Sequence, residues 1–457
     1  MATYPKAPDS LAVFAYIADA DGPKPQHGFV PAGLLNLAGE VQQFGYGKHY
    51  RERRHAIEID PVSLPLVTAD GFTFPRGDLR EFGGIRDAAP DAWGRRVIES
   101  MLKVPANSLP ESLYLLHAGS DRVGALDVRR DIQAPAGPAL SSAVDLGYLL
   151  QTAAMIEEGI EVPAKLQPYF NGISGAGGAR PKASVRSTDG LLWLAKFPSV
   201  SDHGPRNAVL EAGALEIARQ CGIQVPPAYV EMVGDKPVLM IRRFDRYWAA
   251  PGAPLAHGAR AMDTEPAPGL TEGRVGQCTA LTLIGCHESE SHTKAYADIA
   301  KAIRTYCLKD RIAADIEELY ARMILNIFLT NDDDHLRNYS FCYDTVAKGW
   351  RLSPLYDVVP RAQVSQSRRL HLDIGPSGKE ATLDNALAGF SAFFHSEVQA
   401  LRVMHRVWSA VRGWKNLYEQ HGATHAELDY LSAAIRSLAD IASPAVEAKI
   451  RRQHSDI

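Results

Sequence analysis

The feature that most constrains this chain is an apolar helical segment that runs directly into an acidic loop. Residues 319–330 place large apolar side chains at helical spacing, which predicts a helix that carries the loop out of a hydrophobic core. The loop, residues 331–338, contains three consecutive aspartates. Residues 339–353 then have the pattern of a hairpin. We therefore expect this hairpin to return Asp357 to a position beside Asn338.

The spacing of polar residues within the loop indicates a particular chemistry. Asp333 lies five residues before Asn338, the offset that separates the catalytic aspartate from the metal-binding asparagine in protein kinases. Phosphoryl transfer requires a carboxylate near the nucleophile, together with a carboxamide and a second carboxylate on magnesium. The spacing thus predicts Asp333 as the catalytic base and Asn338 and Asp357 as Mg²⁺ ligands.

Other residues of the loop have less specific interpretations. Asp332 and Asp334 are expected to be supporting or solvated charges, and three aspartates alone would be typical of an acidic solvated loop. His335 is a candidate for contact with the nucleotide. An equal alternative is a structural histidine whose hydrogen bonds fix the loop.

A glycine-rich stretch upstream could supply a phosphate-binding loop. Small residues let backbone N–H groups approach phosphates closely, and residues 172–182 offer five candidate contacts: Ser174, Gly175, Gly177, Gly178 and Lys182. The stretch matches neither of the common nucleotide-binding glycine patterns, so an ordinary surface loop is the alternative. Residues 183–185 and 191–197, separated by an Asp189–Gly190 turn, predict a hairpin that follows the loop.

The second strand of this hairpin contains a lysine among apolar residues. An unpaired ammonium group at Lys196 would be costly there, so Lys196 is expected either to reach solvent or to contact phosphates. Residues 206–220 have helical periodicity. Glu211 in this helix is the candidate partner of Lys196, with Glu216 as a substitute, because the kinase lysine is normally held by a helix glutamate. A surface charge is the competing interpretation for Glu211.

A predicted strand at residues 237–242 leads into a candidate adenine-binding hinge. Backbone groups at this hinge would meet the adenine edge, and Arg242, Phe244 and Asp245 are the predicted nucleotide-contacting residues.

Composition limits the class of protein. The chain has 457 residues, 46% hydrophobic and 22% charged, which is typical of a globular protein with more than one domain. A net charge of −4 gives no overall electrostatic footprint for nucleic acid. The five cysteines lack metal-ligand or disulfide spacing. With no signal-peptide pattern and no apolar run of membrane-spanning length, we expect a cytoplasmic protein without membrane association.

We expect an α+β fold with two kinase-like lobes, an extra N-terminal α/β subdomain and a mainly helical C-terminal lobe. The expected parts are residues 1–142, the N-terminal subdomain; 143–246, with the phosphate loop, lysine and hinge; and 247–457, with the catalytic and metal motifs. Residues 249–273 are rich in Pro, Gly and Ala and are expected to be irregular.

Taken together, the motifs resemble those of the HipA-type serine/threonine kinases, the toxins of bacterial HipBA toxin–antitoxin modules. The resemblance covers nearly the whole chain and rests on residues 89–96, 119–126, 177–182, 193–198, 243–246, 331–338 and 353–357. It implies ATP and Mg²⁺ as cofactors, with Lys196 on the nucleotide phosphates. One departure concerns autophosphorylation, because the family often has a serine where this chain has Gly175. The serine here, Ser174, is one residue earlier, and its phosphorylation is a hypothesis.

The predicted function is therefore phosphorylation of a cytoplasmic protein on serine or threonine. The resemblance makes an aminoacyl-tRNA synthetase a first guess for the substrate and a HipB-like antitoxin a possible partner. Any contact with DNA would be indirect, through such a partner, because no helix-turn-helix is evident. Two rivals remain: a small-molecule kinase of the phosphotransferase type, and a catalytically silent binding protein.

Overall fold

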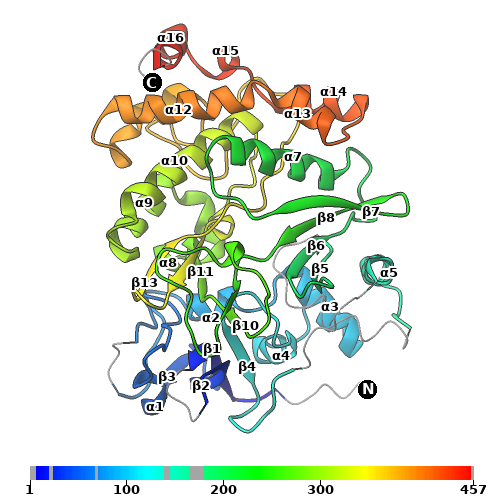
Figure 1. Cartoon of the computed structure of the whole chain (residues 1–457), viewed down its shortest axis with the longest axis vertical. Helices are drawn as coiled ribbons and strands as arrows, with labels where there is room; N and C mark the ends of the chain where they lie inside the picture. Colours follow the sequence, from blue (N-terminus) through cyan, green and yellow to red (C-terminus); the bar gives the residue numbers. More distant parts are fainter. Residues whose placement is uncertain (1–6, 20–23, 67–69, 138–144, 164–179, 454–457) are drawn as a thin grey trace. The chain divides into compact units, whose positions relative to one another are not determined.

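The computed structural model describes residues 7–19, 24–66, 70–137, 145–163 and 180–453 (Figure 1). Contacts divide the chain into two compact units, which we describe separately. Unit 1 comprises residues 1–201, 231–278 and 342–349, and unit 2 comprises residues 202–230, 279–341 and 350–457. The three-part division expected from the sequence stays a prediction.

The N-terminal part of unit 1 is built on a four-stranded antiparallel sheet in the order β3-β2-β1-β4. The strands are β1 (Ser10–Asp19), β2 (Gln26–Asn36), β3 (Gln43–Tyr46) and β4 (Leu126–Arg129). Strand β1 lies in the middle of the sheet and is buried along most of its length. The helices that accompany the sheet are α1 (Lys48–Arg51), α2 (Gly83–Asp87), α3 (Ala92–Leu102) and α4 (Glu111–His117).

Helix α3 begins at a capping aspartate. The Asp91 side chain accepts a hydrogen bond from the Gly94 N–H at 3.0 Å, which satisfies one of the unpaired donors at the helix start. Trp93 and Val97 pack with residues of α5 (Leu146–Glu157) in one hydrophobic cluster. The Trp93 Nε1 donates to the Lys182 carbonyl at 3.0 Å. Helix α3 is therefore tied to the strand that follows the glycine-rich stretch.

The second sheet has the order β5-β6-β8-β7 and contains the hairpin expected from the sequence. Its strands are β5 (Lys182–Arg186), β6 (Leu192–Lys196), β7 (Ala228–Val233) and β8 (Lys236–Arg242). The Asp189–Gly190 turn is confirmed, with Gly190 at φ +90° and Asp189 accepting from Leu191 N–H at 3.1 Å. The register pairs Lys182 with Lys196.

Unit 1 also contains a small two-stranded sheet. Strands β9 (Arg246–Ala249) and β10 (Thr271–Arg274) pair antiparallel. Between them, the only regular element is the short 3-10 helix η2 (Ala261–Asp263). The expected irregular segment is therefore largely as predicted.

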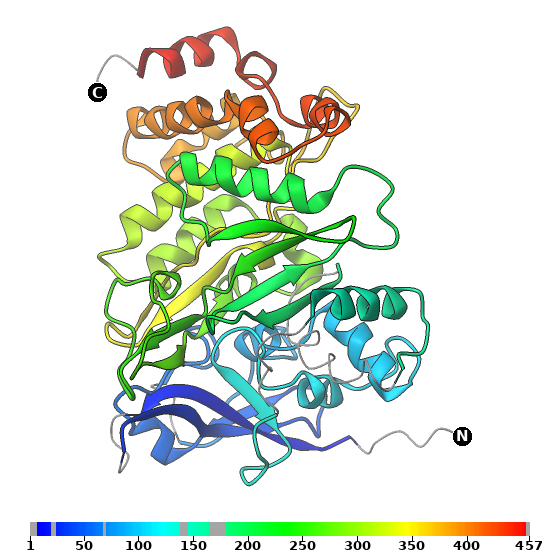
Figure 2. The same cartoon turned by 45° about the vertical axis from the view of Figure 1, so that its right-hand side comes forward.

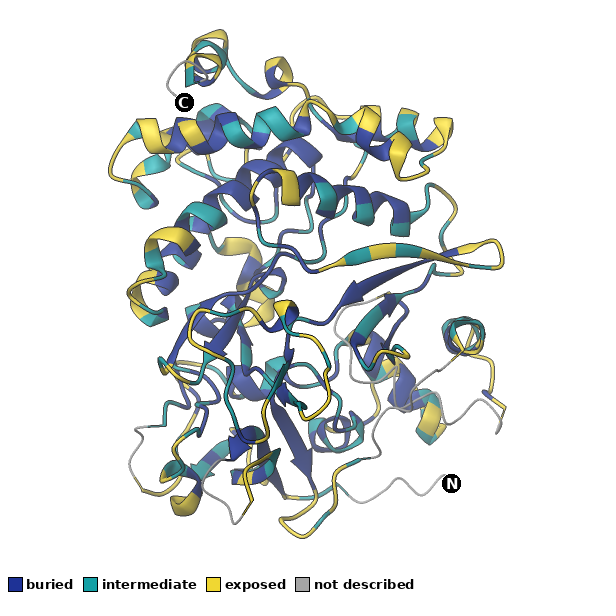
Figure 3. Cartoon of the chain, viewed as in Figure 1, coloured by how far each residue is buried: buried dark blue, intermediate teal, exposed yellow. Residues whose placement is uncertain are grey.

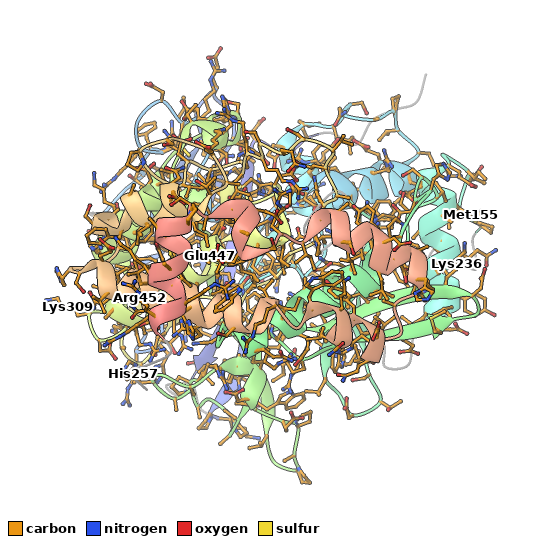
Figure 4. All side chains as sticks on the ribbon, turned by 90° about the horizontal axis from the view of Figure 1, so that it is seen from above. Met155, Lys236, His257, Lys309, Glu447 and Arg452 are labelled. Atoms are coloured by element: carbon orange, nitrogen blue, oxygen red, sulfur yellow. The ribbon has the colours of Figure 1, made fainter. Side chains whose placement is uncertain are left out.

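Unit 2 is mainly helical, as expected. Its helices are α7 (Asn207–Gln220), α8 (Ala280–Ile284), α9 (Tyr296–Tyr306), α10 (Ile312–Leu329), α11 (Leu383–Ala388), α12 (Glu397–Val411), α13 (Trp414–Gln420), α14 (His425–Ala434), α15 (Leu438–Ile441) and α16 (Pro444–Arg452), with short 3-10 turns η3 (Glu288–Thr293), η4 (Leu336–Asn338) and η5 (Phe390–Ala392). All of residues 319–329 in α10 are buried (Figure 3). Helix α10 is thus the central helix of this unit, whereas α16, which carries Glu447 and Arg452 (Figure 4), buries only Val446 and Ile450.

Helix α7 packs closely against α12 and α13, and both views show these helices running beside one another (Figures 1 and 2). Gly213 allows this approach, because a Cβ atom there would lie 2.1 Å from Cε1 of Tyr418. The Tyr418 hydroxyl donates to the Leu210 carbonyl at 2.8 Å. The helix predicted at residues 206–220 is therefore confirmed, and its buried face meets α13.

The hairpin expected after the acidic loop is also present. Strands β11 (Gln277–Thr279), β12 (Ser340–Asp344) and β13 (Gly349–Leu352) form a three-stranded sheet in that order. Lys348, with φ +53°, lies in the turn between β12 and β13. The expected mixed α+β fold is thus confirmed.

Candidate active site

The acidic loop leaves the buried end of α10 through a left-handed turn. Thr330 caps the helix with φ +52°, a conformation that is uncommon for a β-branched residue. Its hydroxyl donates to the Ala434 carbonyl at 2.7 Å. Asn331 follows and hydrogen-bonds Asn326 through its side chain at 3.0 Å. The loop therefore starts from a rigid, buried element, as a positioned catalytic residue requires.

Asn338 and Asp333 are brought together by a direct hydrogen bond. The Asn338 Nδ2 donates to the main-chain oxygen of Asp333 at 2.7 Å, and this bond closes the loop across the five-residue offset. Since Nδ2 is the donor, Oδ1 is the atom that this amide offers to a cation.

The three aspartates of the loop have different surroundings. The Asp333 side chain is 47% exposed and that of Asp332 is 28% exposed. Asp334, in contrast, is only 1% exposed. Asp333 is therefore the most accessible of the three carboxylates to a substrate. The burial of Asp334 fits the expectation of a supporting residue and does not fit that of a solvated charge.

Asp334 is the centre of a buried polar network. Its carboxylate accepts hydrogen bonds from the Tyr296 hydroxyl and from the His371 N–H, both at 2.6 Å. The Tyr296 oxygen in turn accepts from Asn326 at 2.9 Å and from the Tyr339 hydroxyl at 2.8 Å. Burial raises the pKa of Asp334 to about 7, although the hydrogen bonds oppose this shift. This buried network holds the acidic loop in position through Asp334.

Asp332 and Asp333 are both contacted by one arginine. Arg361 Nη2 lies 2.8 Å from Asp333 Oδ2, and Arg361 Nη1 lies 3.2 Å from Asp332 Oδ1. Gln363 Nε2 donates to Asp332 Oδ2 at 2.7 Å. Sequence reasoning missed Arg361 and Gln363. Their only signal was their place a few residues after Asp357.

His335 lies beside both Asp333 and a second histidine. Its Nε2 is 3.8 Å from Asp333 Oδ1, and its ring stands edge-on to that of His371 with centroids 6.1 Å apart. The His371 Nε2 in turn hydrogen-bonds the Ser291 hydroxyl at 3.0 Å. Burial, together with the neighbouring His335, lowers the pKa of His371. These contacts are consistent with a structural role for His335, which the sequence left open.

A hydrogen bond attaches the segment that contains Asp357 to the acidic loop. It joins the residue before Asp357 to the residue before Asn338. The Tyr356 hydroxyl donates to the Arg337 carbonyl at 2.7 Å. Asp357 itself adopts φ +59°, a left-handed conformation that costs a non-glycine residue energy and is frequent at functional sites. Within unit 2, the fold thus joins the two sequence motifs.

The predicted magnesium ligands fit the donor set of a kinase. Among the residues whose positions are described, no three His, Cys, Asp or Glu side chains form a metal-binding cluster. Kinase sites differ from such clusters, since they combine one carboxamide, one carboxylate and the nucleotide's own phosphate oxygens. Asn338 Oδ1 and the Asp357 carboxylate are ligands of these two types.

Part of the predicted nucleotide half lies outside the described residues, namely Ser174, Gly175, Gly177 and Gly178. The two lysines lie in unit 1. Lys182 is buried, with its Nζ 3.9 Å from Asp91 Oδ2, and Lys196 is half-buried opposite it in the hairpin. On α7 of unit 2, Glu211 is buried, whereas Glu216 forms a surface ion pair with Arg219.

The residues of the predicted hinge are held in a buried ionic network. Asp245 is bound by Arg243 Nε at 2.9 Å, by Arg246 Nη1 at 2.5 Å and by the Gly124 N–H at 2.8 Å. Burial would raise the pKa of Asp245, but the two arginines outweigh it and hold the pKa well below its usual range. Arg242 forms an ion pair with Glu265. The carboxylate of Asp245 is thus engaged by contacts within the protein, and the neighbouring Phe244 is partly buried.

A buried helix leads here into an aspartate and an asparagine five residues apart, and a hairpin then leads to a second aspartate a few residues beyond its last strand. This arrangement is that of a kinase-like protein. Comparison with known proteins identifies the family. The family model described as HipA-like C-terminal domain matches residues 174–414, and the chain belongs to this family.

Three individual proteins are similar to this chain. The Sinorhizobium fredii protein named "Putative kinase Y4mE" is 26% identical over 371 residues, covering 75% of this chain and 77% of that protein. The structure of HipA from Shewanella oneidensis MR-1, solved with HipB and operator DNA, matches with a TM-score of 0.64 at 14% identity and covers 97% of both chains. The Helicobacter pylori kinase CtkA gives a TM-score of only 0.36 at 15% identity, over 58% of this chain and 93% of CtkA.

Among the residues that the structure describes, none of the helices is both long and apolar enough to span a membrane.

Proposed function

We propose that this protein is an ATP- and Mg²⁺-dependent kinase that phosphorylates serine or threonine hydroxyls of a protein substrate. The observation that carries the proposal is the closed loop of unit 2, in which Asn338 bonds the main chain of Asp333 and leaves the Asp333 carboxylate accessible. Membership of the HipA-like family supports the proposal.

In the proposed reaction, Asp333 orients the substrate hydroxyl and accepts its proton. The hydroxyl oxygen forms a bond to the γ-phosphorus of ATP, the bond from that phosphorus to the β–γ bridging oxygen breaks, and ADP leaves with that oxygen. Asn338 and Asp357 would hold Mg²⁺, which would neutralise charge at the phosphates. Lys196 and the glycine-rich stretch with Lys182 are the proposed phosphate contacts, and Glu211 is the proposed partner of Lys196.

We also propose where the protein acts, what it phosphorylates and what it binds. The protein acts in the cytoplasm, and its substrate class includes aminoacyl-tRNA synthetases, by resemblance to the HipA-type kinases. Ser174 is the proposed site of autophosphorylation. A HipB-like antitoxin is the proposed partner, since the Shewanella HipA structure contains HipB and operator DNA, and any DNA contact is through that partner.

Label transfer tests the proposal. Purified protein is incubated with Mg²⁺, γ-labelled ATP and a bacterial lysate, and Asp333→Asn serves as the blank. We expect label on a protein as phosphoserine or phosphothreonine, with transfer reduced about 10²–10⁴-fold in the variant because the general base is lost.

Two other outcomes contradict the proposal. Label on a metabolite alone would indicate a small-molecule kinase. A rise in melting temperature with MgATP, without transfer to any acceptor, would indicate a catalytically silent binding protein.

A further inference from the structure

The segment after Asp357 is fixed to the core of unit 2 by a buried arginine. Arg368 is 8% exposed, and its Nη2 donates to the Ala433 carbonyl at 2.7 Å and to the Gln363 carbonyl at 3.1 Å. Its Nη1 donates to the Ala434 carbonyl at 3.0 Å and also contacts the Thr330 hydroxyl. Arg368 thus joins this segment to the residue that ends α10 and to the end of α14.

This anchoring gives the segment a defined position over the acidic loop. From it, Arg361 reaches Asp333 and Asp332 with its two terminal nitrogens, at 2.8 and 3.2 Å. Gln363 holds the remaining oxygen of Asp332 at 2.7 Å. One guanidinium therefore bridges two neighbouring carboxylates, one of them the proposed base.

The strength of the Arg361–Asp333 ion pair indicates whether Arg361 closes the site or orients the Asp333 carboxylate. The Arg361 and Asp333 side chains are both 47% exposed, and exposed ion pairs contribute little to stability. Such a pair is too weak to lock the site shut, and it adds little to the stability of a segment already anchored by Arg368. It is sufficient to select one orientation of a short carboxylate side chain.

The geometry leaves room for the substrate. A carboxylate has about four acceptor positions on its two oxygens. Arg361 contacts Asp333 Oδ2. Among the residues that the structure describes, the only ion-pair partner of Asp333 Oδ1 is His335 Nε2, at the long distance of 3.8 Å. Oδ1 is thus the oxygen placed to accept a hydroxyl proton while Oδ2 is held.

We propose that Arg361 is a positioning residue that orients the Asp333 carboxylate for proton acceptance. The inference rests on the proposed kinase function. A carboxylate that rotates freely spends less time in the reactive orientation, and small misplacements of reacting groups are costly in rate. The contribution of Arg361 therefore falls on kcat and leaves nucleotide binding unchanged.

The test compares three variants in the label-transfer assay with the labelled lysate protein as acceptor. We expect Arg361→Ala to lower kcat about 3- to 5-fold, because an exposed ion pair changes the population of one carboxylate orientation by no more than this, with an unchanged KM for ATP and an unchanged melting temperature. Arg361→Lys recovers part of the loss, because lysine keeps the charge but cannot bridge two carboxylates with a planar fork. Arg406→Ala is the matched control, since Arg406 forms an ion pair of similar exposure with Glu317 on the same unit, and its kcat stays within about twofold.

The inference is overturned if kcat of Arg361→Ala stays within twofold of wild type, rises, or falls no further than that of Arg406→Ala. A parallel loss of melting temperature in Arg361→Ala would also overturn it, by indicating a structural role. Failure of the proposed function is a separate result, because the wild-type protein itself would then transfer no label.

Discussion

Asp334 should make the stability of unit 2 depend on pH. This carboxyl group is 1% exposed, and burial raises its pKa from an ordinary value near 3.8 to about 7. A buried carboxyl with a raised pKa binds its proton more tightly in the folded than in the unfolded protein. Its stabilising contribution is complete below about pH 4 and is lost as the pH rises through 7.

The magnitude follows from the size of the shift. Each pKa unit corresponds to about 1.4 kcal/mol, so a shift of about three units corresponds to an upper bound of about 4 kcal/mol. Between pH 5 and pH 8 the wild-type protein should lose roughly 3 kcal/mol of this contribution. Asp334→Asn does not titrate and should lack this loss.

The assay is thermal unfolding of both proteins at pH 5, 6, 7 and 8. Relative to wild type, the melting temperature of Asp334→Asn should rise by about 6–12 °C across this range, for a cooperative unit of 150–250 residues. Asp315, whose pKa burial raises to about 6, contributes equally to both proteins and cancels. Tyr296→Phe is the control, because it removes the hydroxyl that donates to Asp334 but keeps the titrating group, and so keeps the wild-type trend. Parallel curves for wild type and Asp334→Asn would refute the reasoning.

Two further substitutions test the packing of each unit. Asp245→Asn should cost about 3–5 kcal/mol, because it leaves Arg243 and Arg246 buried without their carboxylate; thermal unfolding measures this, and the exposed Asp263→Asn should change little. Equal melting temperatures for these two variants would contradict the buried network. Gly213→Ala should cost about 1–3 kcal/mol, because its Cβ would lie 2.1 Å from the Tyr418 ring. In a Tyr418→Ala background the same change should cost less, and an unchanged cost would exclude the contact as the cause.

The local elements could be predicted from the sequence because their signals are local. Apolar periodicity indicated α10, and the Asp189–Gly190 turn indicated the β5–β6 hairpin. The five-residue offset from Asn338 singled out Asp333, and the hydrogen bond between these residues is consistent with that choice.

What the sequence could not reveal depends on contacts between distant residues. Asp334 is buried by Tyr296 and His371, which lie 38 and 37 residues away, and nothing in the acidic run distinguishes it from Asp332. Arg361 pairs with Asp333 across 28 residues. The Asp245 carboxylate accepts a hydrogen bond from the backbone N–H of Gly124, 121 residues earlier. Long-range hydrogen bonds and ion pairs of this kind have no periodicity or spacing to detect.

The central claim is that one aspartate of three is the catalytic base, and single-turnover label transfer by Asp332→Asn, Asp333→Asn and Asp334→Asn tests it most directly. Nucleotide affinity and melting temperature are measured in parallel, at pH 6, so that loss of folding is separated from loss of chemistry. We predict that Asp333→Asn lowers the transfer rate about 10²–10⁴-fold with unchanged nucleotide affinity, whereas the other two variants keep most of their rate. An active Asp333→Asn enzyme, or an equal loss in Asp332→Asn, would contradict the account.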